Sequence, residues 1–443
     1  MRPFGRRSFL QLSAAGLALL GTRRSALARP PLGGEKKLLN VFLRGGNDAV
    51  NTLIPQHDPE YASLRPTLGI APGASLDLGN GGAHLHPALA PLVEVFAAGE
   101  LALVHRVGYA GQAGSHFAEQ EVWETADPLA APEAEGFVAR WAAHRLAGIE
   151  LGAVSVAPYV QRMFVGAMAL PQVPTLAGPG EDPMVAKLLG HAPQGQQAGS
   201  GLLRAFHAPE PPGPKGAYDQ SVRQTGITLA STLTLLEALP AWHPPAASFP
   251  TTLPELTALG LPAKTWAAEF FRALRDAVHL LRSSDCRIAG IELDDFDTHT
   301  LQGGVQGAHA ERLAVLAHGL RAVRNETLGG IWNDLVVMVE SEFGRTSHEN
   351  TSGGTDHGRA GVMLLEGGGV LGGVKNCDAV TWPAGQTLAS AEGKYVAHLT
   401  DFRAVLAEVF ARHFGASPAD LDVLIPGWSS LSGPEFAPLG ILL

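Results

Sequence analysis

Six continuous apolar runs of strand length alternate with stretches of helical periodicity along this chain. A run that is apolar at every position buries both of its faces, which is typical of a strand inside a parallel sheet covered by helices. The pattern predicts an α/β fold, a three-layer α/β/α sandwich with a mostly parallel central sheet. The expected strands are Leu38–Leu43, Leu101–Val107, Gly152–Ala157, Arg287–Leu293, Leu335–Glu340 and Gly361–Val370. The expected helices are Pro87–Ala98, His116–Thr125, Phe137–Leu146, Ala263–Arg282, Ala308–Arg324 and Asp401–Phe414.

Residues 171–262 interrupt this alternation. They hold the Pro/Gly-rich segment Ala208–Gly216 and one helical run, Asp219–Leu239. We interpret them as a mostly helical insertion in a single α/β/α domain that spans residues 29–443. The chain has 443 residues, of which 46% are hydrophobic and 17% are charged, so it can bury a large core.

The first 28 residues have the three parts of an export signal. Arg6 and Arg7 form the paired arginines, an apolar stretch covers Phe9–Leu20, and Ala26–Ala28 offers small residues for cleavage. This predicts a twin-arginine signal, with the twin-arginine translocase as partner and a periplasmic or secreted destination. The apolar stretch is shorter than the roughly 20 residues of a membrane span, so we expect no stable membrane span.

Charge argues against a nucleic-acid-binding protein, and the cysteine content argues against a fold held by a disulfide framework or by a cysteine metal cluster. The formal net charge is −10, which disfavours nucleic acid as the main partner because a phosphate backbone would repel the chain. Cys286 and Cys377 are the two cysteines, and neither lies in a metal-type cluster. Whether these two thiols pair is left open.

Acids and histidines follow the expected strands at their carboxyl ends, where the loops of an open parallel sheet converge. Asp48 follows the first strand, Asp297 and His299 follow Arg287–Leu293, and Glu342 follows Leu335–Glu340. His357 precedes the last strand. Each of these residues alone is compatible with a turn or a hydrogen-bonded pair. Together they predict a site for a divalent metal ion at one sheet edge, with zinc as the candidate because imidazole and carboxylate both bind it.

Three further residues are candidates for binding an anion. Arg44 and Arg345 lie beside the acids, and a guanidinium group has the fork shape that suits a tetrahedral oxyanion. Ser115 precedes the expected helix His116–Thr125, whose first amides would favour an anion. Serine is also a preferred N-cap residue, so Ser115 would occupy this position without any chemical role, and both interpretations stay open.

The motifs resemble those of the DUF1501 family, a domain of unknown function. The family pattern appears here as FLRGGNDAVNT, RPTL, SHF, FDTH, SEFGRT and GGTDHG, spread over nearly all of the chain after the signal. Ala49 stands where the family usually has Gly, and Phe296 stands where it usually has Trp. Neither change removes a candidate ligand, although Ala49 changes the turn after the first strand.

That family is distantly similar to the alkaline phosphatase superfamily of phosphohydrolases and sulfatases, and the order of motifs carries this likeness. The resemblance implies an alkaline-phosphatase-like fold and a nucleophilic hydroxyl at Ser115. It also implies metal ligands at Asp48, Asp297, His299, Glu342 and His357. The expected function is metal-dependent hydrolysis of a small phosphate or related anionic ester. The alternative is a non-catalytic periplasmic binding or assembly protein on the same scaffold.

Overall fold

The computed structural model describes residues 35–79, 81–149, 151–157, 161–166, 239–240, 242–389 and 393–443. The predicted signal at residues 1–28 and most of the predicted insertion lie outside the described residues, as does nearly all of the helix expected over Asp219–Leu239. The described end of the insertion contains one short helix, α10 (Leu253–Ala258).

Among the described residues, an eight-stranded sheet forms the centre of the fold, in the order β10-β5-β9-β8-β1-β7-β6, with β11 also paired to β5. Its pairings are parallel except for those of β9, which runs antiparallel to both β5 and β8. All six expected strands are present, but an apolar run reports burial on both faces and not strand direction, so the reversal of β9 could not be predicted from it. The strands are β1 (Lys37–Leu43), β5 (Leu101–Gly108), β6 (Ala153–Ser155), β7 (Ile288–Leu293), β8 (Leu335–Ser341), β9 (Gly361–Glu366), β10 (Gly373–Lys375) and β11 (Thr400–Asp401).

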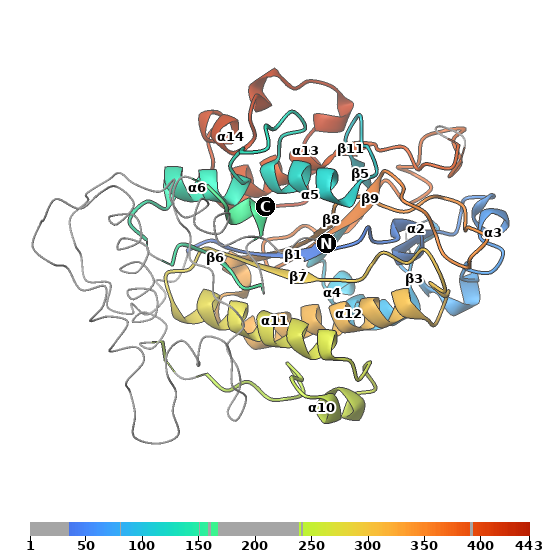
Figure 1. The fold of residues 1–443 in the computed structure, drawn as a ribbon, viewed down its shortest axis with the longest axis horizontal. Coiled ribbons are helices and arrows are strands. Elements are labelled where there is room, and N and C mark those ends of the chain that lie inside the picture. The colour runs from blue at the N-terminus through green and yellow to red at the C-terminus, as the bar shows by residue number, and fades with distance from the viewer. Residues whose placement is uncertain are drawn as a thin grey trace, which may run out of the picture.

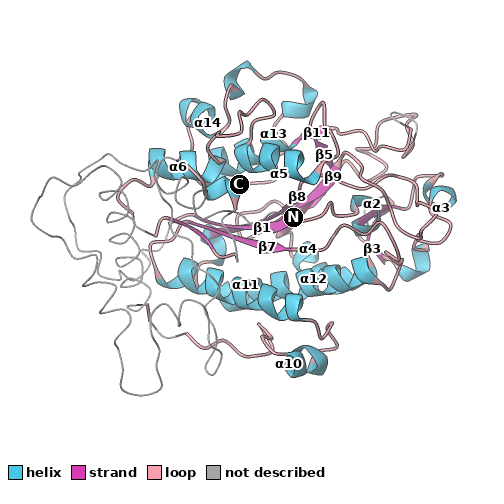
Figure 2. Cartoon of the chain, in the orientation of Figure 1, coloured by secondary structure: helices cyan, strands magenta, loops and turns pink. Residues whose placement is uncertain are grey.

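Helices lie on both sides of this sheet (Figures 1 and 2). The mixed α/β architecture with a mostly parallel sheet is therefore confirmed. One side carries α5 (His116–Thr125), α6 (Phe137–Arg145), α13 (Phe402–Glu408) and α14 (Pro418–Leu424). The other side carries α4 (Val93–Ala97), α11 (Thr265–Ser283) and α12 (Ala308–Thr327).

Alternation along the central strand β1 divides the core into two layers. Leu39, Val41 and Leu43 belong to the hydrophobic cluster that includes the buried residues of α11 and α12. Leu38 and Phe42 point the other way, into the cluster beneath α5, α6 and α13. Because both faces of the strand are buried, its sequence is apolar at nearly every position.

Two expected helices are more complex than their periodicity indicated. The segment predicted as Pro87–Ala98 begins as a 3-10 helix over Pro87–Leu92 and becomes α-helical only in α4, because Pro91 cannot donate a backbone hydrogen bond. The helix predicted as Asp401–Phe414 is α13 followed by a π-helical turn at Val409–His413.

A smaller antiparallel sheet follows β1, in the order β2-β4-β3. Its strands are too short to give a pattern in the sequence. They are β2 (Leu53–Pro55), β3 (Leu76–Asp77) and β4 (Ala83–Leu85), and the same region holds the short helices α2 (Ala49–Thr52) and α3 (Tyr61–Leu64).

The thiols of Cys286 and Cys377 are both free and fully buried. Within the described ranges, no helix combines the length and the apolar character needed to cross a membrane.

Candidate metal centre

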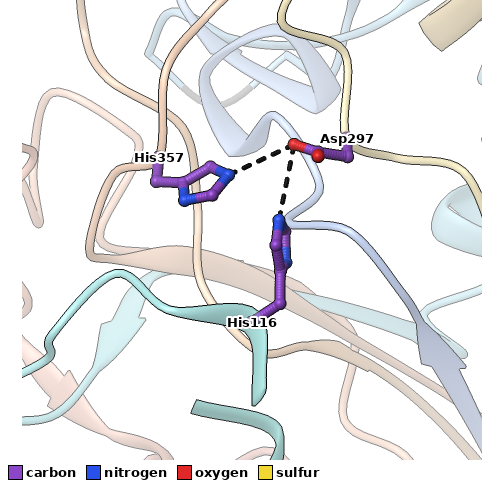
Figure 3. A group of neighbouring side chains, drawn as sticks. All are labelled: His116, Asp297 and His357. Atoms are coloured by element: carbon purple, nitrogen blue, oxygen red, sulfur yellow. Dashed lines mark hydrogen bonds and ion pairs between the residues drawn. The ribbon is translucent and has the colours of Figure 1, made fainter. Parts of the chain in front are cut away.

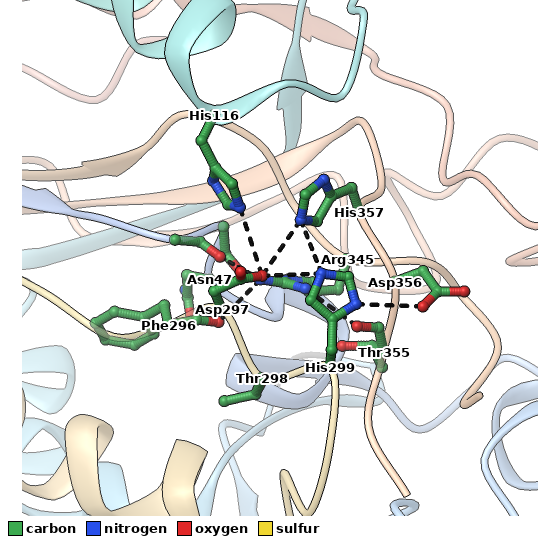
Figure 4. A network of polar contacts seen from close by, with 12 residues as sticks. Asn47, His116, Phe296, Asp297, Thr298, His299, Arg345, Thr355, Asp356 and His357 are labelled. Atoms are coloured by element: carbon green, nitrogen blue, oxygen red, sulfur yellow. Dashed lines mark hydrogen bonds and ion pairs between the residues drawn. The ribbon is translucent and has the colours of Figure 1, made fainter. Parts of the chain in front are cut away.

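Three of the main elements bring polar side chains to one place at the edge of the large sheet. Asp297 and His299 follow β7, Arg345 follows β8, and His357 precedes β9 (Figure 4). His116 is the first residue of α5 and reaches the same place from the helical layer. The strand ends therefore supply most of the cluster, as expected for a parallel sheet.

Three side chains of this cluster form a group that could hold a metal ion. One atom each from His116, Asp297 and His357 falls within 4.8 Å of the others, a spacing at which the group could hold a metal ion (Figure 3). The Oδ1 atom of Asp297 is 3.4 Å from Nε2 of His116 and 3.2 Å from Nε2 of His357. Donor atoms around one zinc ion have bonds of about 2.0–2.2 Å, so they stand a little more than 3 Å apart.

His299 borders this group with a fourth donor. Its Nε2 atom lies 3.1 Å from Oδ1 of Asp297 and 2.9 Å from Nε2 of His357. The carboxylate oxygen of Asp297 thus faces three imidazole rings, and His299 would be the natural fourth ligand or the neighbour of an open position.

Each imidazole is held by its other ring nitrogen. Nδ1 of His116 lies 2.8 Å from Oε1 of Glu342, and Nδ1 of His357 lies 2.7 Å from the carbonyl oxygen of Gly114. Nδ1 of His299 lies 3.3 Å from Oδ1 of Asp356. A carbonyl oxygen and an ionised carboxylate can accept a hydrogen bond but cannot donate one. Each Nδ1 atom therefore carries the proton.

The proton on each Nδ1 leaves the unprotonated Nε2 atoms facing Asp297 and one another. Acceptor atoms that face acceptor atoms at about 3 Å attract a cation between them. This is also the arrangement in which proteins hold metal-binding histidines.

The electrostatics keep Asp297 ionised. Burial alone would raise the pKa of its carboxyl, but the hydrogen bond and charge of Arg345 outweigh burial and hold the pKa below its usual range. The hydrogen bond that His116 donates to Glu342 raises the pKa of His116, whereas burial lowers the pKa of His357. A negative carboxylate flanked by imidazoles suits a divalent cation.

Arg345 fastens the loops of the site together. Its side chain is fully buried and donates to the carbonyl oxygens of Gly46 at 2.7 Å, Thr355 at 3.0 Å and Phe296 at 3.1 Å. It also donates to Oδ1 of Asp297 at 2.5 Å. Because its donors are directed at protein oxygens, Arg345 is placed to position Asp297 and the surrounding loops, and not to bind a free anion.

Glu342 lies behind His116 and does not join the three-residue group. Its buried Oε1 atom accepts from the backbone N–H of Gly45 at 2.9 Å and from Nε2 of Gln120 at 3.0 Å, as well as from His116. Burial would raise the pKa of Glu342, but the hydrogen bonds from His116 and Gln120 hold it below its usual range. Its place corresponds to a carboxylate that orients a metal-binding histidine.

Asp48 also stands outside the three-residue group. Both of its carboxylate oxygens pair with Arg65, at 2.6 and 2.9 Å, and Gln302 donates to Oδ2 at 2.6 Å. Burial opposes ionisation, yet the charge and hydrogen bonds of Arg65 lower the pKa of Asp48 to about 2. The carboxylate that the sequence suggested as a ligand is therefore engaged in a buried ion pair.

Arg44 is likewise engaged by protein carboxylates. Its guanidinium group pairs with Glu124 of α5 and donates from Nε to Glu292 of β7 at 2.9 Å. It also lies 4.2 Å from the centre of the Phe42 ring. These contacts place Arg44 beneath α5 and give it two carboxyl partners from its own chain.

Ser115 is exposed and directly precedes His116. It occupies the N-cap position of α5, but its side chain makes no capping hydrogen bond. The structural role that the sequence left open for this hydroxyl is therefore not realised, and Ser115 lies in the chain next to a member of the three-residue group.

His116 is the member of the group that we did not predict as a ligand from the sequence. It lies in the SHF motif at the start of a helix, whereas the other candidates lie at strand ends. A histidine at a helix start gives no metal signal alone, and its proximity to Asp297 depends on how α5 packs across the sheet.

The sequence was also compared with known proteins. Residues 269–404 match the sequence model of a family described as "Protein of unknown function (DUF1501)". This segment belongs to the DUF1501 family. The DUF1501 segment contains Asp297, His299, Glu342, Arg345 and His357, while His116 and Ser115 lie outside it. It therefore includes two members of the three-residue group.

No curated protein matches the chain. Among solved structures, the PH0037 protein from Pyrococcus horikoshii is 12% identical, with a TM-score of 0.24 over 78% of this chain and 94% of that chain. A likeness of this size bears on neither the fold nor the function of this chain.

Proposed function

We propose that this chain is a metal-dependent hydrolase of phosphate or related anionic esters. One observation carries the proposal: Nε2 atoms of His116 and His357 converge on the ionised carboxylate of Asp297, with a third imidazole beside them. Each ring is held in place by a hydrogen bond at Nδ1. Such preset donors fit a metal ion without rearrangement.

The donor set favours zinc. Imidazole nitrogens together with one carboxylate are typical zinc ligands, whereas magnesium and calcium prefer sites made of oxygen atoms. His116, Asp297 and His357 would hold the ion, and His299 would be its fourth ligand or stand beside an open position. When bound, the ion would lower the pKa of a coordinated oxygen nucleophile and neutralise charge on the ester group.

The substrate anion would lie at the start of α5. The first amides of this ten-residue helix have no side-chain cap from Ser115 and therefore remain candidates for binding an oxyanion beside His116. The exposed hydroxyl of Ser115 is the candidate nucleophile. Its oxygen would lose the proton, form a bond to the ester centre and break the bond to the alcohol, which would leave with a proton. Water would then cleave the serine ester and release the anion. Arg345 would act by holding Asp297, and Arg44 by holding the sheet side of α5.

The likeness to the alkaline phosphatase superfamily enters as part of this proposal. The order of candidate residues supports it: an acid after β1, a serine at the start of α5, an Asp/His pair after β7 and a histidine before β9. Asp48 is engaged by Arg65, and Glu342 supports His116. We therefore propose a derivative with a single metal ion. The paired Arg6 and Arg7 support the further proposal that the twin-arginine translocase exports it to the periplasm or the exterior.

A second candidate function is a non-catalytic binding or assembly protein on the same scaffold. The observation in its favour is that the guanidinium groups of Arg44 and Arg345 are both directed at protein oxygens. Because neither guanidinium group is directed at the substrate position, a hydrolase would have to hold its substrate through backbone amides and the metal ion.

The decisive experiment combines metal analysis with an ester panel. We expect protein purified from its native host to hold about one zinc ion per chain and to cleave a phosphomonoester, a phosphodiester or a sulfate ester. His116→Ala and His357→Ala should lose the metal and the activity. His144→Ala, which removes an imidazole of α6 that pairs with Asp420 of α14, is the matched control and should keep both.

The two candidate functions give different results in this assay. Ser115→Ala should keep the metal and lose turnover if the hydroxyl is the nucleophile. Metal retention with no turnover on any ester would favour the binding protein. Metal content that does not change in His116→Ala and His357→Ala would overturn the metal centre itself.

A further inference from the structure

Helix α5 contacts the sheet through a row of polar side chains. His116, Gln120 and Glu124 are four residues apart and so lie along one face of the helix. His116 and Gln120 both reach Oε1 of Glu342, at 2.8 and 3.0 Å, and Glu124 pairs with Arg44. We call these three residues the polar row of α5.

The polar row connects α5 to three adjacent strands of the sheet, β8, β1 and β7. Glu342 directly follows β8, and its Oε1 also accepts from the backbone N–H of Gly45, just after β1. Arg44, also after β1, joins Glu124 to Glu292 of β7. The ends of β7 and β8 precede Asp297 and Arg345 of the proposed metal centre. The same strand ends therefore also bind α5, which begins with His116.

Apolar packing contributes little to the seating of this helix. Its buried residues are Glu119, Trp123, Glu124 and Thr125, and Trp123 is the one large apolar side chain among them. Trp123 stacks on Phe402 of α13 at 4.4 Å and so ties α5 to its neighbouring helix. Trp123 and the partly buried Val122 give α5 few apolar contacts, so we infer that its rotation and height depend on the polar row.

Glu119 extends the role of α5 to a second imidazole. Its carboxylate accepts from the backbone N–H groups of Ala113 and Gly114, and the carbonyl of Gly114 binds Nδ1 of His357. A shift of α5 would therefore move the support of His357 together with His116.

We propose that Gln120 and Glu124 are positioning residues that hold α5 so that Nε2 of His116 faces Asp297. This inference rests on the proposed metal function and assigns to Arg44 the part of a helix anchor. Neither residue belongs to the three-residue group. They affect the position of His116 indirectly, because Gln120 binds Glu342, Glu124 binds Arg44, and these contacts fix the position of α5 on the sheet.

The experiment compares Gln120→Ala and Glu124→Ala with Val122→Ala. Val122 is partly buried in the core beneath α5 and lies outside the polar row, so its truncation weakens the packing of the helix without removing a polar contact. Glu124→Gln keeps an oxygen that accepts from Arg44 and serves as the conservative rescue. All variants are full-length chains.

Two measurements are made on each variant. The first is the affinity for Zn²⁺ and for Co²⁺ as a spectroscopic substitute, which should fall about tenfold or more in Gln120→Ala and Glu124→Ala. The second is the ring-nitrogen NMR spectrum of His116 in metal-free protein, which should show an Nδ1 proton in the wild type and a mixture of tautomers in the two alanine variants. Val122→Ala and Glu124→Gln should resemble the wild type in both measurements.

The outcomes separate the two proposals. If no form binds metal but the NMR spectrum changes as expected, the metal function fails and the positioning role stands. If the wild type binds metal and Val122→Ala weakens binding as much as Gln120→Ala and Glu124→Ala do, the positioning role fails and the metal function stands. Wild-type affinity in both alanine variants would also overturn the positioning role.

Discussion

Helices α11 and α5 cover opposite faces of the same sheet in different ways. α11 buries Phe270, Phe271, Leu274 and several other apolar side chains in the larger cluster. α5 buries two acids, a threonine and one tryptophan, and binds the sheet through its polar row. The face that carries candidate chemistry is thus held by directional contacts, which fix geometry, while the other face is held by apolar area, which mainly supplies stability.

The largest expected effect concerns the polar side of this comparison. Arg65→Ala should lower the free energy of unfolding by about 3–5 kcal/mol, because it leaves the carboxylate of Asp48 buried without its partner. Urea denaturation measures the change. A loss below about 1 kcal/mol would show that water or Gln302 replaces the guanidinium, and that polar contacts at this edge contribute less to stability than their burial suggests.

The apolar face is tested by Leu274→Ala. Leu274 is fully buried. It packs closely against α12, because a Cβ atom added at Gly319 of that helix would meet the Leu274 side chain at 2.8 Å. The substitution should cost about 2–5 kcal/mol by urea denaturation, through lost burial and the cavity left behind. Metal affinity of the folded fraction should stay at the wild-type value. A fall in affinity would mean that the two faces are coupled, contrary to the comparison.

Acid should weaken the polar side selectively. The pKa of Asp48 is about 2 in the folded protein against 3.8 as its ordinary value, so the folded state binds this proton less readily than the unfolded state does. Its contribution is complete above the ordinary value and is lost as the pH falls from about 4 to about 2. A shift of this size corresponds to roughly 2 kcal/mol. Urea denaturation of the wild type and Asp48→Asn between pH 2 and pH 6 should show a smaller pH dependence in the variant.

The smallest expected effect separates a realised helix cap from an unused one. Ser417 caps α14 in a capping box with Asp420, whereas Ser115 makes no capping bond to α5. Ser417→Ala should therefore cost about 1 kcal/mol, and Ser115→Ala should leave stability nearly unchanged. Thermal or urea denaturation decides this. Equal losses in the two variants would mean that Ser115 caps α5 in solution.

Element positions were largely predictable because they depend on local apolar patterns. The bounds expected for α5, His116–Thr125, are those of the structure, and all six strands are present. The direction of β9 was not predictable, because an apolar run indicates burial on both faces and does not indicate whether the strand pairs parallel or antiparallel. Short strands such as β3, at Leu76–Asp77, give too little pattern to detect.

The candidate site was predictable only where strand ends define it. Asp297, His299 and His357 lie together because they flank β7 and β9 at one edge of the sheet. The partner of Asp48 could not be predicted, since Arg65 reaches it from the end of α3, 17 residues along the chain, and no periodicity describes that separation. His116 was hidden for a related reason, because its place depends on the packing of α5 and not on its own sequence neighbourhood.

The attachment points of Arg345 have a consequence for the order in which the protein folds. Its guanidinium group joins the loop after β1, 299 residues away, to the loop after β7, 49 residues away. His357 must also find Gly114 across 243 residues. Contacts of such separation form late, because the loops that they close cost chain entropy before any contact is gained. A nascent or unfolded chain therefore lacks the assembled donors, and a metal ion would be acquired by a finished fold instead of guiding its formation.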